Sequence, residues 1–394
     1  MAASGPSRYF AGLSRNTVLL ALASLFADIS TEMLYPVLPV FMTQTLKASG
    51  SVVGLVDGIA QATQNIAQGF SGWLSDRLQR RKPVALVGFF LAAISKPLIG
   101  LAASWHGVLG ARFLDRLGAG VRSAPRDALI ASSVAPEHRG KAFGLEGFGD
   151  NLGAFLGPLL AVFLLAYLAV EMRLIFFLAV IPGLLALAMV AFVREPRTDV
   201  AAGAKIDISL RHLPSAYWRY LLATALFGLG NVSTSFLILQ TQAVGVSLDK
   251  TILIYAAFNL TAALVSYPAG FLSDELGRRN ILLVAFAIFL ATYLGFALTT
   301  NIGSIALLFM LYGAFQGIFR SVGKALATDL VPEALRASGI GCYTATIGLL
   351  GLVASVVGGL LWDHVGHAAV FLYGAAFAVV GSIALLVLVP AKQG

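Results

Sequence analysis

Apolar stretches of about 20 residues recur along the whole chain, separated by short polar connections. A helix of that length crosses the roughly 30 Å hydrocarbon core of a bilayer. Only 12% of the residues are charged and 58% are hydrophobic, whereas about a quarter of a soluble domain is charged. The pattern predicts an all-α integral membrane protein with about twelve spans, near 16–42, 51–73, 83–104, 106–130, 140–168, 173–193, 217–242, 251–272, 280–299, 302–325, 338–361 and 367–390.

A charged segment occurs twice, each time directly after a long apolar run. Residues 72–82 read GWLSDRLQRRK, and residues 270–279 read GFLSDELGRR. A repeat separated by about half the chain indicates two homologous halves, an architecture typical of repeat-built transporters. The longest polar connection falls between the sixth and seventh spans. We therefore expect an N-terminal six-helix bundle, a cytoplasmic linker and a C-terminal six-helix bundle, at 1–194, 195–216 and 217–394.

The basic residues predict the orientation in the membrane. With the N-terminus inside, the cytoplasmic connections and both tails carry most of the 27 Lys and Arg, and the outer connections carry only Lys47, Arg173 and Lys250. This asymmetry follows the positive-inside rule and places both termini in the cytoplasm. The net charge of +8 is then a topology signal and gives no support for nucleic-acid binding. Short loops and the lack of a targeting signal favour a bacterial inner membrane.

Charged residues inside two predicted spans are candidates for proton coupling or cargo binding. Asp28 and Glu32 lie one turn apart on the first span, so they share a face. Arg112, Asp115 and Arg116 lie on the fourth span, and counting residues places Arg112 level with Glu32 and Arg116 level with Asp28. Because ionised groups are costly in a membrane, we expect a buried acid–base cluster that binds and releases protons. A static ion-pair network between the two spans is the alternative.

Other polar residues in the spans extend this candidate site. Glu146 and Asp150 form a second acid pair, either as relay or cargo residues or as partners of Arg122 or Arg126. Further polar side chains are expected to line the transport cavity, although each is equally suited to an interhelical hydrogen bond: Gln61, Gln64, Tyr255, Asn259 and Gln316. In the fifth span, Gly153 and Gly157 lie four residues apart and form a smooth face for close helix packing. Pro158, which follows them, is expected to kink the helix.

These motifs together resemble the major facilitator superfamily. The repeated segment is similar to its motif A, with Gln79 and Glu275 as departures, and residues 116–120 (RLGAG) are similar to motif B. Residues 153–158 (GAFLGP) are similar to motif C, which marks proton-driven antiporters. The resemblance implies twelve transmembrane helices in two pseudo-symmetric six-helix bundles. Motif A implies a conformational latch of charged pairs at the cytoplasmic helix ends, formed by Gly72, Asp76, Arg77, Arg81, Gly270, Asp274, Arg278 and Arg279.

The sequence also excludes some classes of protein. It contains no phosphate-binding loop of the ATPase type, no paired nucleophile and base, and no metal-binding motif. We therefore expect a non-enzymatic, monomeric, proton-coupled secondary transporter without cofactor or metal, which exports a small amphipathic or cationic compound. Its partners would be the cargo, protons and the lipid bilayer. Two alternatives remain: a proton-driven importer of a nutrient, siderophore or metal chelate, and a membrane receptor or lipid-moving protein that transports nothing.

Overall fold

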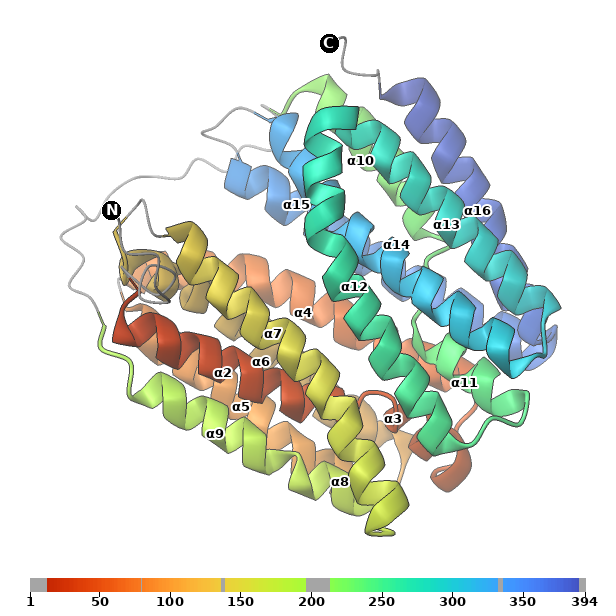
Figure 1. Ribbon diagram of the computed structural model, residues 1–394, viewed down its shortest axis with the longest axis horizontal. Coiled ribbons are helices and arrows are strands. Elements are labelled where there is room, and N and C mark those ends of the chain that lie inside the picture. Colours follow the sequence, from red (N-terminus) through yellow and green to blue (C-terminus); the bar gives the residue numbers. More distant parts are fainter. Residues whose placement is uncertain (1–12, 79, 136–138, 196–212, 332–335, 390–394) are drawn as a thin grey trace, which may run out of the picture.

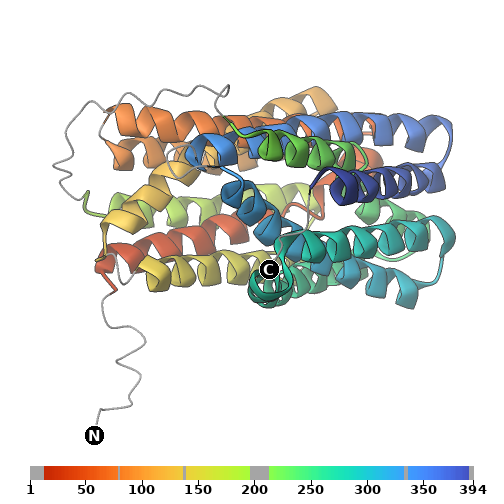
Figure 2. The ribbon, with the colours of Figure 1, turned by 90° about the horizontal axis from the view of Figure 1, so that it is seen from above.

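Long helices joined by short loops make up nearly all of the chain that the structure, a computed structural model, describes (Figure 1). The described residues are 13–78, 80–135, 139–195, 213–331 and 336–389. The long helices run side by side along one direction (Figure 2). Among these residues, eight helical segments are long and apolar enough to cross a membrane. The protein is therefore a multi-pass membrane protein with an all-α fold.

The helices of the first half correspond to the first six predicted spans. They are α2 (Arg15–Glu32), α3 (Leu38–Val40), the π-helical turn η1 (Phe41–Thr45), α4 (Gly50–Leu78), α5 (Arg81–Leu101), α6 (Trp105–Ser132), α7 (Arg139–Val162), the π-helical turn η3 (Phe163–Tyr167), α8 (Met172–Leu178) and α9 (Val180–Ala191).

The helices of the second half correspond to the last six predicted spans. They are α10 (Ser215–Gly228), α11 (Ser235–Ala243), α12 (Leu248–Leu276), α13 (Arg278–Leu298), α14 (Ile302–Asp329), α15 (Arg336–His364) and α16 (His367–Leu388).

Two predicted spans are interrupted by several residues, and the span predicted at 173–193 is divided into α8 and α9 by the single residue Ala179. The span predicted at 16–42 ends its first helix at Glu32, because Pro36 and Pro39 lack the N–H groups that a continuous helix needs. The span predicted at 217–242 ends its first helix at Gly228 and resumes at Ser235. Both interruptions place irregular backbone beside the contact between the two halves, where other helices cover it.

Helix packing repeats from the first half to the second. In the first half α2 packs on α7 and α9, α6 packs on α4 and α5, and α5 packs on α9. In the second half the corresponding helices pack in the same way: α10 on α15 and α16, α14 on α12 and α13, and α13 on α16. The two extensive contacts between halves, α4 with α15 and α12 with α7, are also counterparts. The fold is therefore a pair of pseudo-symmetric helical bundles (Figure 1).

The contact between α4 and α15 extends from the start of α4 to its middle. A Cβ atom added at Gly54 would lie 2.0 Å from the Ser355 carbonyl oxygen, and one added at Gly58 would lie 2.7 Å from the Leu352 side chain. Farther along, one added at Gly348 would lie 2.6 Å from the Asn65 amide. We call the end of the molecule where α4 begins the Gly50 end, and the opposite end, where α2 begins, the Arg15 end. The backbones are packed together in the half toward the Gly50 end.

Candidate functional site

A row of glycines on α7 brings this helix against α2, which carries the two candidate acids of the first span. A Cβ atom added at Gly149 or Gly153 would lie 2.5 Å from a carbonyl oxygen of α2, and one added at Gly157 would lie 2.8 Å from the Met33 nitrogen. Pro158 follows inside the same helix. The two backbones therefore touch because these positions have no side chain.

This contact predicts a specific loss of stability. We expect Gly153→Ala to destabilise the protein by about 1–3 kcal/mol, because its methyl group would meet the Leu25 carbonyl and the Asp28 side chain. Gly147→Ala on the same helix is the matched control, since a Cβ atom there meets nothing within 4 Å. Thermal unfolding of the purified variants in detergent measures the difference. Equal midpoints for the two variants would contradict the close contact.

Asp115 on α6 is the centre of the most deeply buried polar group in the first half. It is fully buried and pairs with Lys96 of α5, with Arg112 at 2.9 Å and with Arg116 at 2.7 Å. We call these four residues the Asp115 cluster. Lys96 also donates to the Thr31 hydroxyl at 3.2 Å, so the cluster connects α5 and α6 to α2.

The single carboxylate of Asp115 therefore forms ion pairs with three cations. The next nearest acid is Asp57 on α4, whose carboxylate lies 3.6 Å from the Arg112 guanidinium. Lys96, Arg112 and Asp57 are all more than nine-tenths buried. The Nε atom of Arg112 has no hydrogen-bond partner among the described residues. Glu32 interacts electrostatically with Arg112 and Arg116, so three carboxylates, those of Asp115, Asp57 and Glu32, face the three cations.

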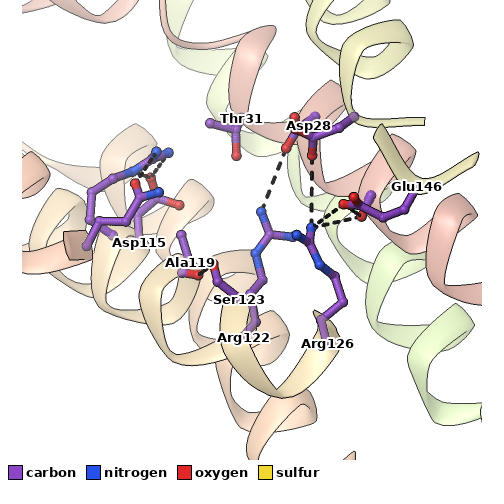
Figure 3. A network of polar contacts seen from close by, with 12 residues as sticks. Asp28, Thr31, Asp115, Ala119, Arg122, Ser123, Arg126 and Glu146 are labelled. Atoms are coloured by element: carbon purple, nitrogen blue, oxygen red, sulfur yellow. Dashed lines mark hydrogen bonds and ion pairs between the residues drawn. The ribbon is translucent and has the colours of Figure 1, made fainter. Parts of the chain in front are cut away.

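Two more arginines of α6 pair with three of the other candidate acids (Figure 3). Arg122 lies 3.8 Å from Asp28, and Arg126 lies 2.8 Å from Glu146. The Asp150 carboxylate is farther from Arg126, at 4.0 Å, and is partly exposed. Ser24 of α2 donates to Glu146 at 2.9 Å and accepts from Arg126 at 2.9 Å. Carboxylates of α2 and α7 are thus held by consecutive turns of α6.

The pairing expected from residue counting was wrong by more than one turn. Asp28 pairs with Arg122 and not with Arg116. Arg112 and Arg116 both pair with Asp115, which is on their own helix and therefore needs no alignment with a neighbour. Among the described residues, Glu32 forms no ion pair within 4.0 Å. Counting along each helix fixes depth in the membrane approximately, but it does not fix the rotation of one helix against another.

Glu32 makes its hydrogen bond with the other half of the molecule. The Tyr255 hydroxyl of α12 donates to the Glu32 carboxylate at 2.8 Å. The Tyr255 ring stacks on the Tyr35 ring, with 5.6 Å between centroids, and the Arg112 guanidinium lies 5.7 Å from the Tyr35 centroid. A carboxylate of the first half is therefore connected both to the second half and to the Asp115 cluster.

Two other acids also connect the halves. Asp57 accepts hydrogen bonds from Ser233, at 2.8 Å, and from Ser235, both at the start of α11. Asp363, in the last turn of α15, accepts from the backbone N–H groups of Gly50 and Ser51, each at 2.8 Å. The first N–H groups of a helix have no partner within it, so Asp363 caps α4 from the other half.

The residues expected to line a cavity have different surroundings. Gln64 accepts from Arg116 at 3.1 Å, and Gln61 is exposed. Asn259 donates to the Ala154 carbonyl at 3.2 Å, across the contact between α12 and α7. Gln316 donates to the Tyr312 hydroxyl at 3.2 Å, within the second half. Asn259 thus forms an interhelical bond, the alternative that the sequence left open, whereas the bond of Gln316 lies within α14.

The expected latch lies only partly within the described side chains. The side chains of Asp76, Arg77 and Asp274, and the surroundings of Gly72 and Gly270, lie outside what the structure describes. Arg81 donates to the Ala128 carbonyl of α6 at 3.4 Å, Arg278 pairs with Asp329 of α14 at 2.6 Å, and Arg279 donates to the Leu386 carbonyl of α16 at 3.1 Å. These described partners lie within the same half as the arginine concerned, and the latch stays a prediction.

Several partners in this site could not be identified from the sequence. Tyr35, Ser24, Ser233, Ser235 and Asp363 are single polar residues without a motif. The chemistry available from all these groups is charge pairing, hydrogen bonding and proton exchange.

Comparison with known proteins identifies the family. The chain matches the Major Facilitator Superfamily over residues 20–240 and 220–394. It is 34% identical over 380 residues to an uncharacterised transporter of this type from Methanocaldococcus jannaschii, with 95% of each chain covered. It is 25% identical over 360 residues to multidrug resistance protein 1 of Bacillus subtilis, covering 88% of this chain and 90% of that protein.

A solved structure agrees with the arrangement of the helices. The nucleoside transporter NupG, crystallised as a point mutant, superposes with a TM-score of 0.78 at 14% identity, over 95% of this chain and 100% of that one. At this identity the likeness concerns the fold alone. The sequence match, the duplicated bundles and the charged residues within the helices agree, and the chain belongs to the major facilitator superfamily of membrane transporters.

Proposed function

We propose that this protein is a proton-coupled secondary transporter that works as a monomer by alternating access. Its two moving parts would be the bundles 1–194 and 217–394, joined by a linker at 195–216. The excess of Lys and Arg in the connections at the Arg15 end favours a cytoplasmic position for that end and for both termini. The short loops favour a bacterial inner membrane.

The observation that carries proton coupling is the hydrogen bond between Glu32 and Tyr255. A hydrogen bond to an ionised carboxylate is about twice as strong as one between neutral groups. Protonation of Glu32 would therefore weaken a contact that holds the two halves together. Conversely, separation of the halves would change the environment of Glu32 and so its affinity for a proton. Asp28, one turn away and paired with Arg122, is the second acid that such a cycle would use.

The packing of the halves fits one stage of that cycle. The close contact of α4 with α15 lies toward the Gly50 end, as does the cap that Asp363 forms on α4. With the Arg15 end in the cytoplasm, these contacts close the outer side. Rocking of the bundles would break the contact between α4 and α15 and expose the groups around Glu32 to the outside.

For the cargo, we propose a small amphipathic or cationic compound that is exported in exchange for protons. The glycine face of α7 supports an antiporter, and the similarity to multidrug resistance protein 1 supports export of this class of compound. Aromatic surfaces beside carboxylates, as at Tyr35, Tyr255 and Glu32, suit a cation with an apolar body. Import of a nutrient or chelate with protons is the outcome that would replace this proposal.

Transport in inside-out vesicles with a respiration-driven pH gradient tests the proposal. We expect lipophilic cations to collapse the gradient in vesicles with the unaltered protein, and Glu32→Gln and Asp28→Asn to abolish that response. Glu171→Gln is the matched control, because Glu171 is exposed at the start of α8, away from the site. A response that survives in both acid variants would exclude these residues from proton coupling. A gradient that increases when a carboxylate or chelate is added outside, because that compound enters the lumen together with protons, would support import.

A further inference from the structure

Two carboxyl groups from different helices meet beside the arginines of α6. Asp28 of α2 lies 3.8 Å from the Nη2 atom of Arg122 (Figure 3), and Asp150 of α7 lies 4.0 Å from Arg126. A Cβ atom added at Gly153 would lie 2.9 Å from the Asp28 Cβ atom, so α7 touches α2 next to this acid. Asp150 precedes Gly153 by three residues and is therefore its neighbour on the same face of α7. The contact of the two backbones brings the two carboxyl groups together.

The close approach of these carboxyl groups favours one proton between them. The side chains of Asp28 and Asp150 lie within hydrogen-bonding range of each other, and their charges repel when both are ionised. An ionised carboxylate only accepts hydrogen bonds, so a hydrogen bond between two carboxyl groups requires a proton on one of them. Two carboxyl groups in one site therefore share a proton when no cation separates them.

The cations beside the pair are too few to replace that proton. Within 4.0 Å of the three acids Asp28, Asp150 and Glu146, the described residues supply two cations, Arg122 and Arg126. Arg126 lies much closer to Glu146, at 2.8 Å, than to Asp150. Asp28 and Asp150 both act electrostatically on Arg122. One guanidinium is thus left for two carboxyl groups.

Arg122 also neutralises Asp28 only loosely. Their separation of 3.8 Å is longer than a hydrogen bond, whereas a charge-assisted hydrogen bond has a length of about 2.8 Å. The Arg122 side chain is more than nine-tenths buried, and its Nη1 atom has no hydrogen-bond partner among the described residues. The Phe89 ring covers this cation at 4.6 Å. The arginine is near enough to attract the pair but does not saturate it.

The remaining charged groups around the pair do not change this balance. They are Glu32 on α2, Arg116 and Asp127 on α6, and Arg320 and Lys324 on α14. Arg116 already pairs with Asp115 at 2.7 Å, and Arg320 acts on Glu32. Asp127 is partly exposed and pairs with Arg126, which occupies that arginine further. Helix α9, which also packs on α2, has no titratable residue.

We propose that Asp28 and Asp150 bind one proton jointly at neutral pH and form a single proton site between α2 and α7. The Asp150 side chain is 42% exposed and that of Asp28 is 21% exposed, so Asp150 is the member through which the proton exchanges with water. Loss of the proton would leave two like charges across the glycine contact of the two helices. A role of this site in transport rests on the function proposed above, whereas the shared proton itself does not.

Infrared spectroscopy of the purified protein in detergent tests the shared proton without any transport assay. A protonated carboxyl group has a carbonyl stretching band that an ionised carboxylate lacks. We expect this band at neutral pH, and we expect its loss in Asp28→Asn and in Asp150→Asn alike, because each variant leaves one carboxylate beside Arg122. Asp127→Asn is the matched control and should keep the band, because Asp127 contacts Arg126 but lies outside the pair.

The double variant separates one shared proton from two independent ones. Asp28→Asn combined with Asp150→Asn should lose no more band intensity than either single variant. Absence of the band from the unaltered protein, its persistence in Asp150→Asn, or a double variant that loses the sum of two separate bands would overturn the proposal. Asp150 is partly exposed, so Asp150→Asn is decisive even if Asp28→Asn does not fold.

The vesicle assay then tests whether this proton is used in transport. We expect Asp150→Asn to abolish the response to lipophilic cations, as Asp28→Asn does. If the band behaves as expected but the unaltered protein gives no cation response, the proposed function is wrong and the shared proton is still supported. The two proposals therefore fail by different measurements.

Discussion

Replacement of Asp115 by asparagine is expected to destabilise the protein more than any other single loss of charge described above. The substitution leaves Lys96, Arg112 and Arg116 without the carboxylate that they share. Removing one partner of a buried ion pair costs about 3–5 kcal/mol, because the remaining charge stays buried and unpaired. We expect little folded Asp115→Asn protein in the membrane, measured as the monodisperse fraction after mild detergent extraction.

A matched control and a double variant make this prediction specific. Asp127→Asn removes a carboxylate of the same helix that pairs with Arg126 but is partly exposed, and its cost should be below about 1 kcal/mol. Lys96→Met combined with Asp115→Asn removes one of the orphaned cations and should recover part of the folded protein. If the double variant is as unstable as the sum of the two single variants, the cluster does not act as a unit.

Gly54→Ala is expected to hold the Gly50 end open. A Cβ atom at this position would lie 2.0 Å from the Ser355 carbonyl oxygen, so α4 and α15 cannot approach as they do in this structure. The clash involves backbone and cannot be relieved by a side-chain rotation. We expect the equilibrium between the two packings of the bundles to shift by at least about tenfold toward separation at this end.

Cysteine labelling from the outside measures this shift. Ser51→Cys, in a background where Cys342, the single cysteine, is replaced by alanine, places a thiol at the start of α4 beside α15. Its reaction with a membrane-impermeant maleimide should be about tenfold faster in the presence of Gly54→Ala. Gly69→Ala on the same helix is the control, because a Cβ atom there meets nothing within 4 Å. Unchanged labelling in the Gly54→Ala protein would show that the α4–α15 contact does not close this end.

The features that sequence could predict are those set by local composition. Apolar length predicted where the helices lie, and the repeat at 72–82 and 270–279 predicted two similar halves. The interruptions after Glu32 and Gly228 were not predicted, although prolines follow the first and glycines lie at the second. They were missed because an apolar run continues through them, and length alone does not distinguish one helix from two.

Which charged residues are buried could be predicted, but not which of them form pairs. Asp28, Asp115 and Glu146 were identified because a charge in a span needs a partner. Their actual partners depend on how α2, α6 and α7 are shifted and rotated against each other, and a shift of six residues, more than one turn, exchanges Arg116 for Arg122. Glu32 and Asp57 form hydrogen bonds to the second half because of how the two bundles pack together. A single sequence does not specify that packing.

The cap that Asp363 places on α4 makes the two symmetry-related contacts of this fold energetically unequal. Helix α12, the counterpart of α4, has an acidic residue of its own in the first turn, Asp249, although its N-cap residue Ser247 makes no side-chain hydrogen bond to the helix. The first two N–H groups of α4 are instead satisfied by a residue more than 300 positions away in the sequence, and only while the bundles touch. Opening at the Gly50 end is therefore, in part, the uncapping of a helix, and water must replace Asp363 before α4 and α15 can part.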